Sequence, residues 1–194
     1  MAKRITLIIS LSLVGLIAAT FIALAFIPVN IGFTFADPAI INIYNNGNTE
    51  SPLLKQEYET MEYYDVVESL EKSFKKSVLK SMFAGELSNK LTTISYTTTH
   101  NVSLSSGTWL VFDYSVASGS EKQYVLDEEG NKLSNQATYD KLAIKLNSEN
   151  ATNNVMVYLG SFNTSSKTFS YKYAYSTYGN LSEVYNIVSN FINK

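Results

Sequence analysis

Apolar side chains recur along this chain with three different periods. Residues 5–27 are almost continuously apolar and carry no charge, residues 54–84 contain a four-residue apolar repeat, and beyond residue 91 apolar and polar positions alternate. A long apolar run predicts a membrane helix, a repeat near 3.6 residues predicts an amphipathic helix, and alternation predicts β-strands. The order of these patterns therefore predicts an apolar helix, a soluble helix and then a sheet.

The apolar run is long enough to cross a lipid bilayer. As a helix, residues 5–27 would span about 34 Å, slightly more than the roughly 30 Å of a bilayer's hydrocarbon core. Lys3 and Arg4 precede the run, whereas the next basic residue after it is Lys55. Because basic residues beside a membrane span stay in the cytoplasm, residues 1–4 are expected there and the chain after residue 27 is expected outside the membrane.

A secretory signal that is removed after export is the alternative for the same residues. Small residues that would suit cleavage occur at 23–25 and 34–36. The apolar region of a signal peptide usually covers about 7 to 15 residues, however, and the run here is longer. We therefore expect a retained anchor in the lipid bilayer through residues 5–27, with a secreted protein as the alternative.

Residues 28–52 are expected to link the anchor to a folded domain. Apolar residues alternate over 40–44 and then give way to the polar, turn-forming residues 45–48. We interpret this range as a short extended segment followed by an extracytoplasmic stalk.

The first soluble helix is predicted over residues 54–84, with a break near Glu62 as an alternative. Its apolar stripe consists of residues four positions apart, namely Val66, Leu70, Phe74, Val78 and Met82. Acidic residues fill the first half of the helix and lysines the second half, which is the order that the helix dipole favours. These charges are therefore interpreted as a solvated surface, and Gly85 suits the C-terminal cap.

Alternating patterns predict about five to six strands within residues 53–194, which we expect to form one α+β domain. The stretches concerned are 91–99, 109–117, 122–127, 137–147, 155–161 and 168–177, of which 137–147 has a helical stripe as an alternative. Turn residues between consecutive strands favour an antiparallel meander, and a short helix is predicted over 181–192. The long helix should cover one face of the sheet, a shape generically similar to cystatin-like and nuclear-transport-factor-like domains, although no residue motif supports membership of either.

One row of aromatic residues is a candidate binding surface. Phe169, Tyr171, Tyr173 and Tyr175 occupy every second position of the last predicted strand and are expected on one face. Beneath the long helix they would stabilise the sheet as core residues. Exposed, they and Trp109 would form a surface that stacks on sugar rings or adheres to a protein, so carbohydrate is the ligand class that this alternative implies.

The chain carries little candidate chemistry. It has no cysteine, which excludes disulfides and thiolate metal sites, and its single histidine, His100, has no second histidine or carboxylate beside it. The 17 acidic residues outnumber the 15 basic ones, which does not favour nucleic-acid binding. No phosphate-binding loop or nucleophile elbow occurs. We therefore expect no metal, no cofactor and no catalytic residue.

These observations lead to the hypothesis of a non-catalytic binding or structural module of the cell envelope, displayed by a single membrane span and acting with a protein partner. One alternative is a filament subunit, because an apolar helix followed by an antiparallel sheet is similar to type IV pilin-like proteins. The processing glycine and the early acidic residue of that family are missing, since Arg4 and Ile5 occupy the junction. Another alternative is an exported hydrolase with a pocket near Asp113, Asp140 or Lys141.

Overall fold

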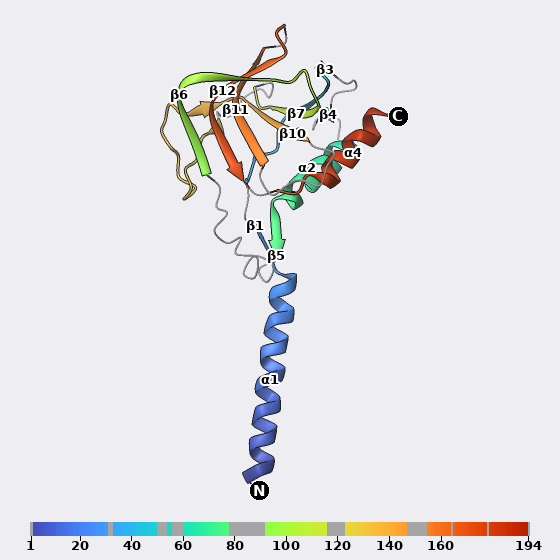
Figure 1. Ribbon diagram of the computed structural model, residues 1–194, viewed down its shortest axis with the longest axis vertical. Coiled ribbons are helices and arrows are strands. Elements are labelled where there is room, and N and C mark those ends of the chain that lie inside the picture. Colours follow the sequence, from blue (N-terminus) through green and yellow to red (C-terminus); the bar gives the residue numbers. More distant parts are fainter. Residues whose placement is uncertain are drawn as a thin grey trace.

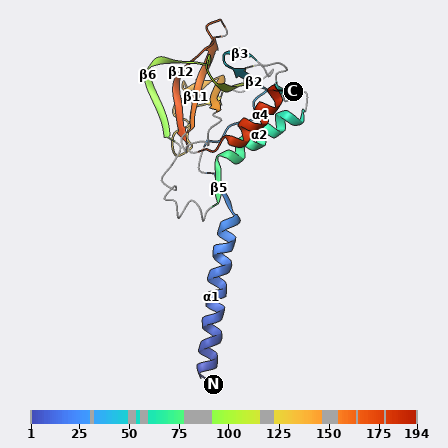
Figure 2. The same cartoon turned by 45° about the vertical axis from the view of Figure 1, so that its right-hand side comes forward.

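The apolar run forms a helix that stands apart from the rest of the chain. The computed structural model describes residues 2–30, 33–49, 54–55, 60–77, 92–115, 123–146, 155–163, 165–177 and 179–193. In it, α1 (Ala2–Phe26) projects away from an α+β domain formed by the later elements, as two views of the ribbon show (Figures 1 and 2). The predicted helix is therefore present, one residue shorter at its C-terminal end than expected.

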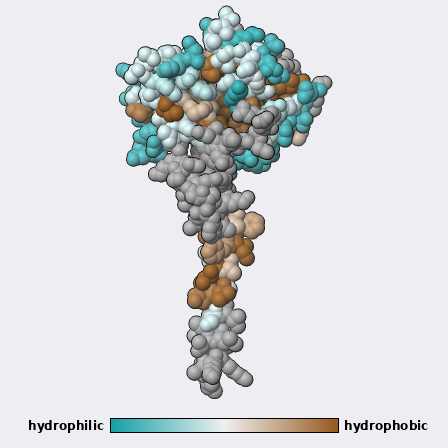
Figure 3. All heavy atoms as spheres, viewed as in Figure 1, coloured by the Kyte–Doolittle hydropathy of each residue, from teal (hydrophilic) through white to brown (hydrophobic). Residues whose placement is uncertain are grey.

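Most of the described side chains of α1 are exposed, and Leu24 and Ala25 are half-buried. The exposed ones belong to Ser10, residues 12–23 and Phe26, and the space-filling view shows hydrophobic side chains over the described part of the rod, below a largely hydrophilic domain (Figure 3). Phe26, the last residue of the helix, is 80% exposed. Within the described part of the chain, none of the helices combines the length and the apolar character that crossing a membrane requires.

The segment after α1 is built into the domain, whereas the sequence predicted a stalk over residues 28–52. β1 (Pro28–Asn30) pairs antiparallel with β5 (Lys75–Ser77), and Phe33 is buried in the main core. β2 (Ile40–Asn45) then lies within the large sheet, beside β7, and the short strands β3 (Asn48–Thr49) and β4 (Leu54–Lys55) pair with its other edge. Alternating apolar residues in β2 bury Ile41 and Ile43, which is why this range folds as a strand.

The large sheet is antiparallel throughout. Its strand order is β3-β2-β7-β10-β11-β12-β6, with β4 also beside β2. The remaining long strands are β6 (Thr92–Ser103), β7 (Thr108–Asp113), β10 (Lys141–Leu146), β11 (Val155–Asn163) and β12 (Thr168–Thr177). A separate pair joins β8 (Gln123–Tyr124) to β9 (Thr138–Tyr139). Strands β7, β10, β11 and β12 lie side by side in chain order, while β8 and β9, which come between β7 and β10 in the sequence, leave the predicted meander for the separate pair. The α+β class is confirmed.

β6 departs from the meander. Although only a short turn separates it from β7, it pairs with β12 at the far side of the sheet. The ribbon of β6 is correspondingly curved and arches across the end of the sheet (Figure 1). Leu104 follows β6 and holds the chain where it passes from β12 toward β7. Its N–H donates to the Lys167 carbonyl at 3.0 Å, and its side chain is fully buried.

The soluble helix is shorter than predicted. α2 covers Met61–Ser73 and is capped by the Thr60 side chain, which accepts a hydrogen bond from the Tyr63 N–H. The Ser73 carbonyl accepts from the Asn180 N–H at 3.0 Å, so it is engaged outside the helix, and the backbone continues into β5. The predicted positions Val78, Met82 and Gly85 lie outside the described residues.

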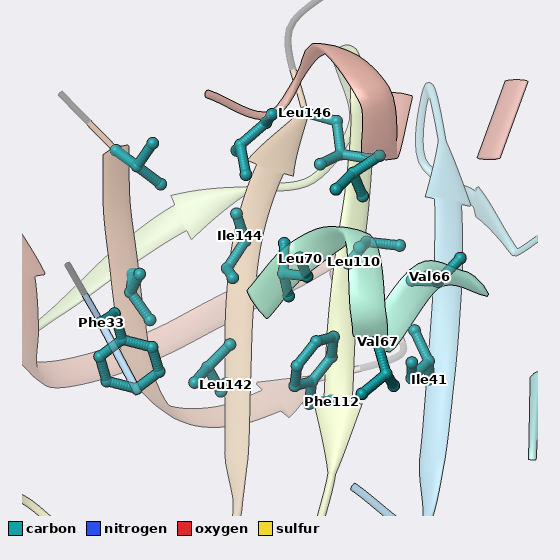
Figure 4. Close-up of a cluster of buried hydrophobic side chains, with 14 of the residues drawn as sticks. Phe33, Ile41, Val66, Val67, Leu70, Leu110, Phe112, Leu142, Ile144 and Leu146 are labelled. Atoms are coloured by element: carbon teal, nitrogen blue, oxygen red, sulfur yellow. The ribbon is translucent and has the colours of Figure 1, made fainter. Parts of the chain in front are cut away.

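Both soluble helices cover the same face of the sheet. α2 and α4 (Ser182–Ile192) lie side by side in both ribbon views (Figures 1 and 2). The close-up shows Val66, Val67 and Leu70 of α2 above side chains of the central strands (Figure 4). The predicted stripe of Val66, Leu70 and Phe74 is thus confirmed as core.

The opposite face of the sheet carries a second, smaller core. Its buried members are Tyr44, Leu104, Trp109, Val111, Ala143 and Phe169. The rings of Tyr44 in β2 and Phe162 in β11 lie 4.7 Å apart although β7 and β10 separate their strands. In a flat sheet with about 4.8 Å between neighbouring strands, the backbones of β2 and β11 would lie about 14 Å apart. The contact between the two rings therefore shows that the sheet curls toward this face.

Candidate functional site

A β-bulge in β12 divides the predicted aromatic row between the two faces of the sheet. Gly160 of β11 pairs with Tyr171, and the preceding residue, Leu159, pairs with Tyr173, which leaves Lys172 as an inserted residue. One inserted residue shifts the alternation of side chains by one position. Phe169 and Tyr171 accordingly belong to the smaller core, whereas Tyr173 and Tyr175 belong to the core beneath the helices.

Three of the five candidate aromatic residues are core residues. Phe169 and Tyr175 are buried, and Trp109 is only 2% exposed, with its Nε1 donating to the Ser106 carbonyl at 2.9 Å. The Tyr175 hydroxyl accepts from the Leu126 N–H at 2.7 Å and donates to the Leu126 carbonyl at 3.0 Å. These contacts assign the three rings to structural roles.

Tyr171 is partly exposed and is held by other aromatic rings. Its centroid lies 4.8 Å from that of Tyr158, 5.7 Å from that of Tyr96 and 6.0 Å from that of His100. Burial, followed by the neighbouring phenol of Tyr96, raises the pKa of the Tyr171 hydroxyl, which therefore stays protonated at neutral pH. The ring is thus a fixed platform with a hydroxyl that can both donate and accept.

A cleft of about 600 Å³ opens beside Tyr171, at the bulge. It is lined by Leu159 and Gly160 of β11, Thr99 of β6 and residues 136 and 138–140, among others. β6 bulges here. Tyr171 pairs with His100 and Tyr173 with Ser95, so four residues of β6 lie opposite the single residue Lys172 of β12. Two irregularities on neighbouring strands therefore create the hollow.

Gly160 allows the backbones to approach at the floor of this cleft. A Cβ atom at this position would lie 1.9 Å from the Ser170 carbonyl oxygen and 2.9 Å from the Tyr171 Cα. Such contacts are with backbone, which cannot move aside easily, so only glycine fits. The glycine in an otherwise regular strand pattern is the sequence signal that could have located this bulge.

The cleft is rich in hydroxyl groups and nearly balanced in charge. Its hydroxyl-bearing residues include Thr99, Thr138, Ser161, Ser170, Tyr171 and Tyr173. Among the described lining residues, Asp140 carries a negative charge and Lys172 a positive one. Gln136 adds an amide that can donate and accept. The cleft therefore offers many neutral hydrogen-bonding groups, three lining tyrosines and little net charge.

Asp113 and Lys141, two of the residues considered for a hydrolase, form an ion pair between adjacent strands. They are directly opposite in the pairing of β7 with β10, and the Lys141 ammonium donates to Asp113 Oδ2. Burial alone would raise the pKa of Asp113, but hydrogen bonds from Lys141 and from Ser115 lower it below its ordinary value. The pair therefore holds an ionised carboxylate between β7 and β10. Asp140, the third residue considered for a hydrolase, lines the cleft instead.

His100 lies on the exposed part of β6. Its ring is 4.5 Å from that of Tyr96, and its Nε2 is 3.5 Å from the Thr98 hydroxyl. Across the described residues, no group of histidine, cysteine and carboxylate side chains has an arrangement that would hold a metal ion. The ring of His100 is instead a packing neighbour of the Tyr171 ring.

The comparisons with known proteins give no relative. No family model, no curated protein and no solved structure matches this chain. The site must therefore be interpreted from its own geometry.

Proposed function

We propose that the chain is a single-pass membrane protein whose α+β domain lies outside the cytoplasmic membrane and acts as a non-catalytic binding module of the cell envelope. The observation that carries this proposal is the free-standing apolar helix. Along the described part of α1, large apolar side chains are exposed at Leu13, Val14, Leu16, Ile17, Phe21, Ile22 and Phe26.

Exposed apolar area on this scale needs a partner that removes it from water. The 25 residues of α1 rise about 38 Å, which exceeds the thickness of a bilayer's hydrocarbon core. Lys3 and Arg4 near its start supply the charge that keeps this end in the cytoplasm. We therefore infer that lipid covers the exposed apolar side chains of the rod, and the domain would follow on the outer side.

The side of the membrane can be tested with single cysteines, because the chain has none of its own. Ser134 is exposed in the domain, and Ala2 begins α1. A membrane-impermeant maleimide should label Ser134→Cys on intact cells and Ala2→Cys only after permeabilisation. Labelling of Ala2→Cys alone on intact cells would reverse the topology.

Insertion itself can be tested with a matched pair of variants. Val14→Lys combined with Ile17→Lys places charges on exposed positions of α1 and should release the protein from membranes washed at alkaline pH. Met61→Lys, at a 76% exposed position of α2, should leave it in the membrane fraction. A wild-type chain that is fully extracted by the wash, or a mature chain that lacks residues 5–27, would contradict a retained anchor.

A further inference from the structure

The chain contains four sequences of the form Asn-X-Ser/Thr, which is the acceptor motif for N-linked glycans. Their asparagines are Asn101, Asn150, Asn163 and Asn180. Four is about the number that a chain so rich in Asn, Ser and Thr would contain by chance, so the motif alone selects none of them. Asn150 lies outside the described residues, and the surroundings of the other three differ.

Asn163 is the last residue of β11 and lies at the turn that leads into β12. Its side chain is exposed, as are those of Ser165, Ser166 and Lys167 in the turn. Both ribbon views place this turn at the end of the domain opposite to α1 (Figures 1 and 2). An enzyme can therefore reach Asn163 without meeting the helices or the anchor.

The turn orients the amide of Asn163. Its Oδ1 accepts hydrogen bonds from the backbone N–H groups of Ser165 at 3.0 Å and Ser166 at 3.1 Å. Because an N–H group can only donate, these contacts identify the oxygen and leave Nδ2 on the other side of the amide. Neither Nδ2 nor the Ser165 hydroxyl bonds to any residue that the structure describes. Both functional groups of this motif are therefore free and on exposed residues.

The motif at Asn101 is part of the sheet. Asn101 lies within β6, directly opposite Ser170 of β12, and its Oδ1 accepts from the Ser170 hydroxyl at 2.7 Å. The motif hydroxyl, that of Ser103, is 2.6 Å from the Ser105 hydroxyl and is therefore hydrogen-bonded. A transferase would have to detach β6 from its neighbour to bind this motif.

The motif at Asn180 is held against the helices. The Asn180 N–H donates to the Ser73 carbonyl at 3.0 Å, and its Oδ1 accepts from the Ser182 hydroxyl at 2.8 Å. Leu181, between the two motif residues, is only 3% exposed. Binding to an enzyme would require Leu181 to leave the core. The fold therefore favours Asn163 over the other two positions.

We propose that Asn163 carries an N-linked oligosaccharide. In the transfer step, Nδ2 forms a bond to C1 of an oligosaccharide held on a lipid phosphate, the bond between C1 and the phosphate oxygen breaks, and Nδ2 loses one proton while the lipid phosphate leaves. A membrane oligosaccharide transferase supplies the catalytic groups. The inference rests on the proposed function, because this transfer takes place outside the cytoplasm.

The test is mass spectrometry of the full chain purified from the membranes of its own cells. Chymotrypsin cleaves after tyrosine, so a cut after Tyr158 separates Asn163 from the motif at Asn150. The peptide with Asn163 should carry an added mass that releases sugar fragment ions. Its occupancy should exceed that of Asn101 and Asn180. An unmodified Asn163, or occupancy no higher than at those two positions, would overturn the proposal.

Matched variants of the turn test the motif itself. Ser165→Ala removes the motif hydroxyl and should abolish the added mass, whereas Ser165→Thr keeps a hydroxyl and should retain it. Ser166→Ala, one position beyond the motif, should also retain it. A modification that survives in Ser165→Ala, or is lost in Ser165→Thr, contradicts N-linked transfer to Asn163.

Maleimide labelling of Ser134→Cys on the same cells separates this inference from the proposed topology. A domain that is labelled from outside but has an unmodified Asn163 overturns the glycan alone. A domain that the reagent does not reach overturns the topology as well.

Discussion

Tyr171 and Tyr173 are two positions apart in β12 and yet belong to opposite faces of the sheet. In a regular strand they would share a face, but Lys172 is inserted between them as a bulge opposite the junction of Leu159 and Gly160. The same irregularity lies beside the cleft. Local strand geometry therefore determines both the second core and the candidate binding site.

Gly160→Ala should destabilise the domain strongly. The new methyl group would meet the Ser170 carbonyl oxygen at 1.9 Å, so strands β11 and β12 would have to separate locally. We expect a loss of about 2 to 3 kcal/mol in the free energy of unfolding, measured by urea denaturation. Gly15→Ala in α1 meets no atom within 4 Å and should change the unfolding of the domain very little.

Tyr175→Phe should loosen the segment around Leu126. Removing the hydroxyl takes away the 2.7 Å bond of the Leu126 N–H and the 3.0 Å bond of the Leu126 carbonyl, although this carbonyl still accepts from the Thr93 hydroxyl at 2.6 Å. We expect a cost of about 1 to 3 kcal/mol and faster amide hydrogen exchange at Leu126. The matched control is Tyr185→Phe on α4, and equal exchange rates at Leu126 in both variants would contradict a role for this clamp.

The Asp113 carboxylate should make stability depend on acidity. Its folded pKa lies below its ordinary value, so its contribution is complete above about pH 4 and is lost as the pH falls through the folded pKa. Asp113→Asn should cost about 2 kcal/mol at pH 7 and show a smaller loss of stability between neutral and acidic pH than the wild type. Urea denaturation from pH 7 down to about pH 2 measures both effects.

Asp140→Asn is the control for this measurement, because Asp140 is exposed beside Lys141 in the sequence. It should retain the wild-type dependence on pH. An Asp113→Asn variant whose stability falls with acid as steeply as that of the wild type would show that other carboxylates dominate the acid response.

Leu70→Ala should weaken the contact between α2 and the sheet. Leu70 is 0% exposed and lies among central-strand side chains (Figure 4), so truncation leaves a cavity. The expected cost is about 2 to 5 kcal/mol in thermal or urea unfolding. Met61→Ala, on the same helix but 76% exposed, should cost less than about 0.5 kcal/mol.

Periodicity predicted the elements whose burial is regular. The stripe of Val66, Leu70 and Phe74 and the alternation in β10 and β11 indicated which side chains face the main core, and the structure buries them there. The α+β class follows from these patterns. Helix ends were less predictable, because the Ser73 carbonyl is engaged by Asn180, a partner far along the chain.

Long-range pairing could not be predicted from local patterns. Nothing near β6 indicates that it pairs with β12, because the crossing depends on burial of Leu104 and on the curl of the whole sheet. The split of the aromatic row was missed for a related reason. A bulge changes the face of every later residue, and Gly160, which permits it, belongs to the neighbouring strand.

The pairing of β1 with β5 has a mechanical consequence. Only Ile27 separates α1 from β1, and only Phe74 separates α2 from β5, so the rod and the helix that rests on the sheet are joined by backbone hydrogen bonds. A flexible linker would let the domain rotate freely relative to α1. Here a tilt of the rod is transmitted to α2, so the orientations of α1 and of the domain are coupled.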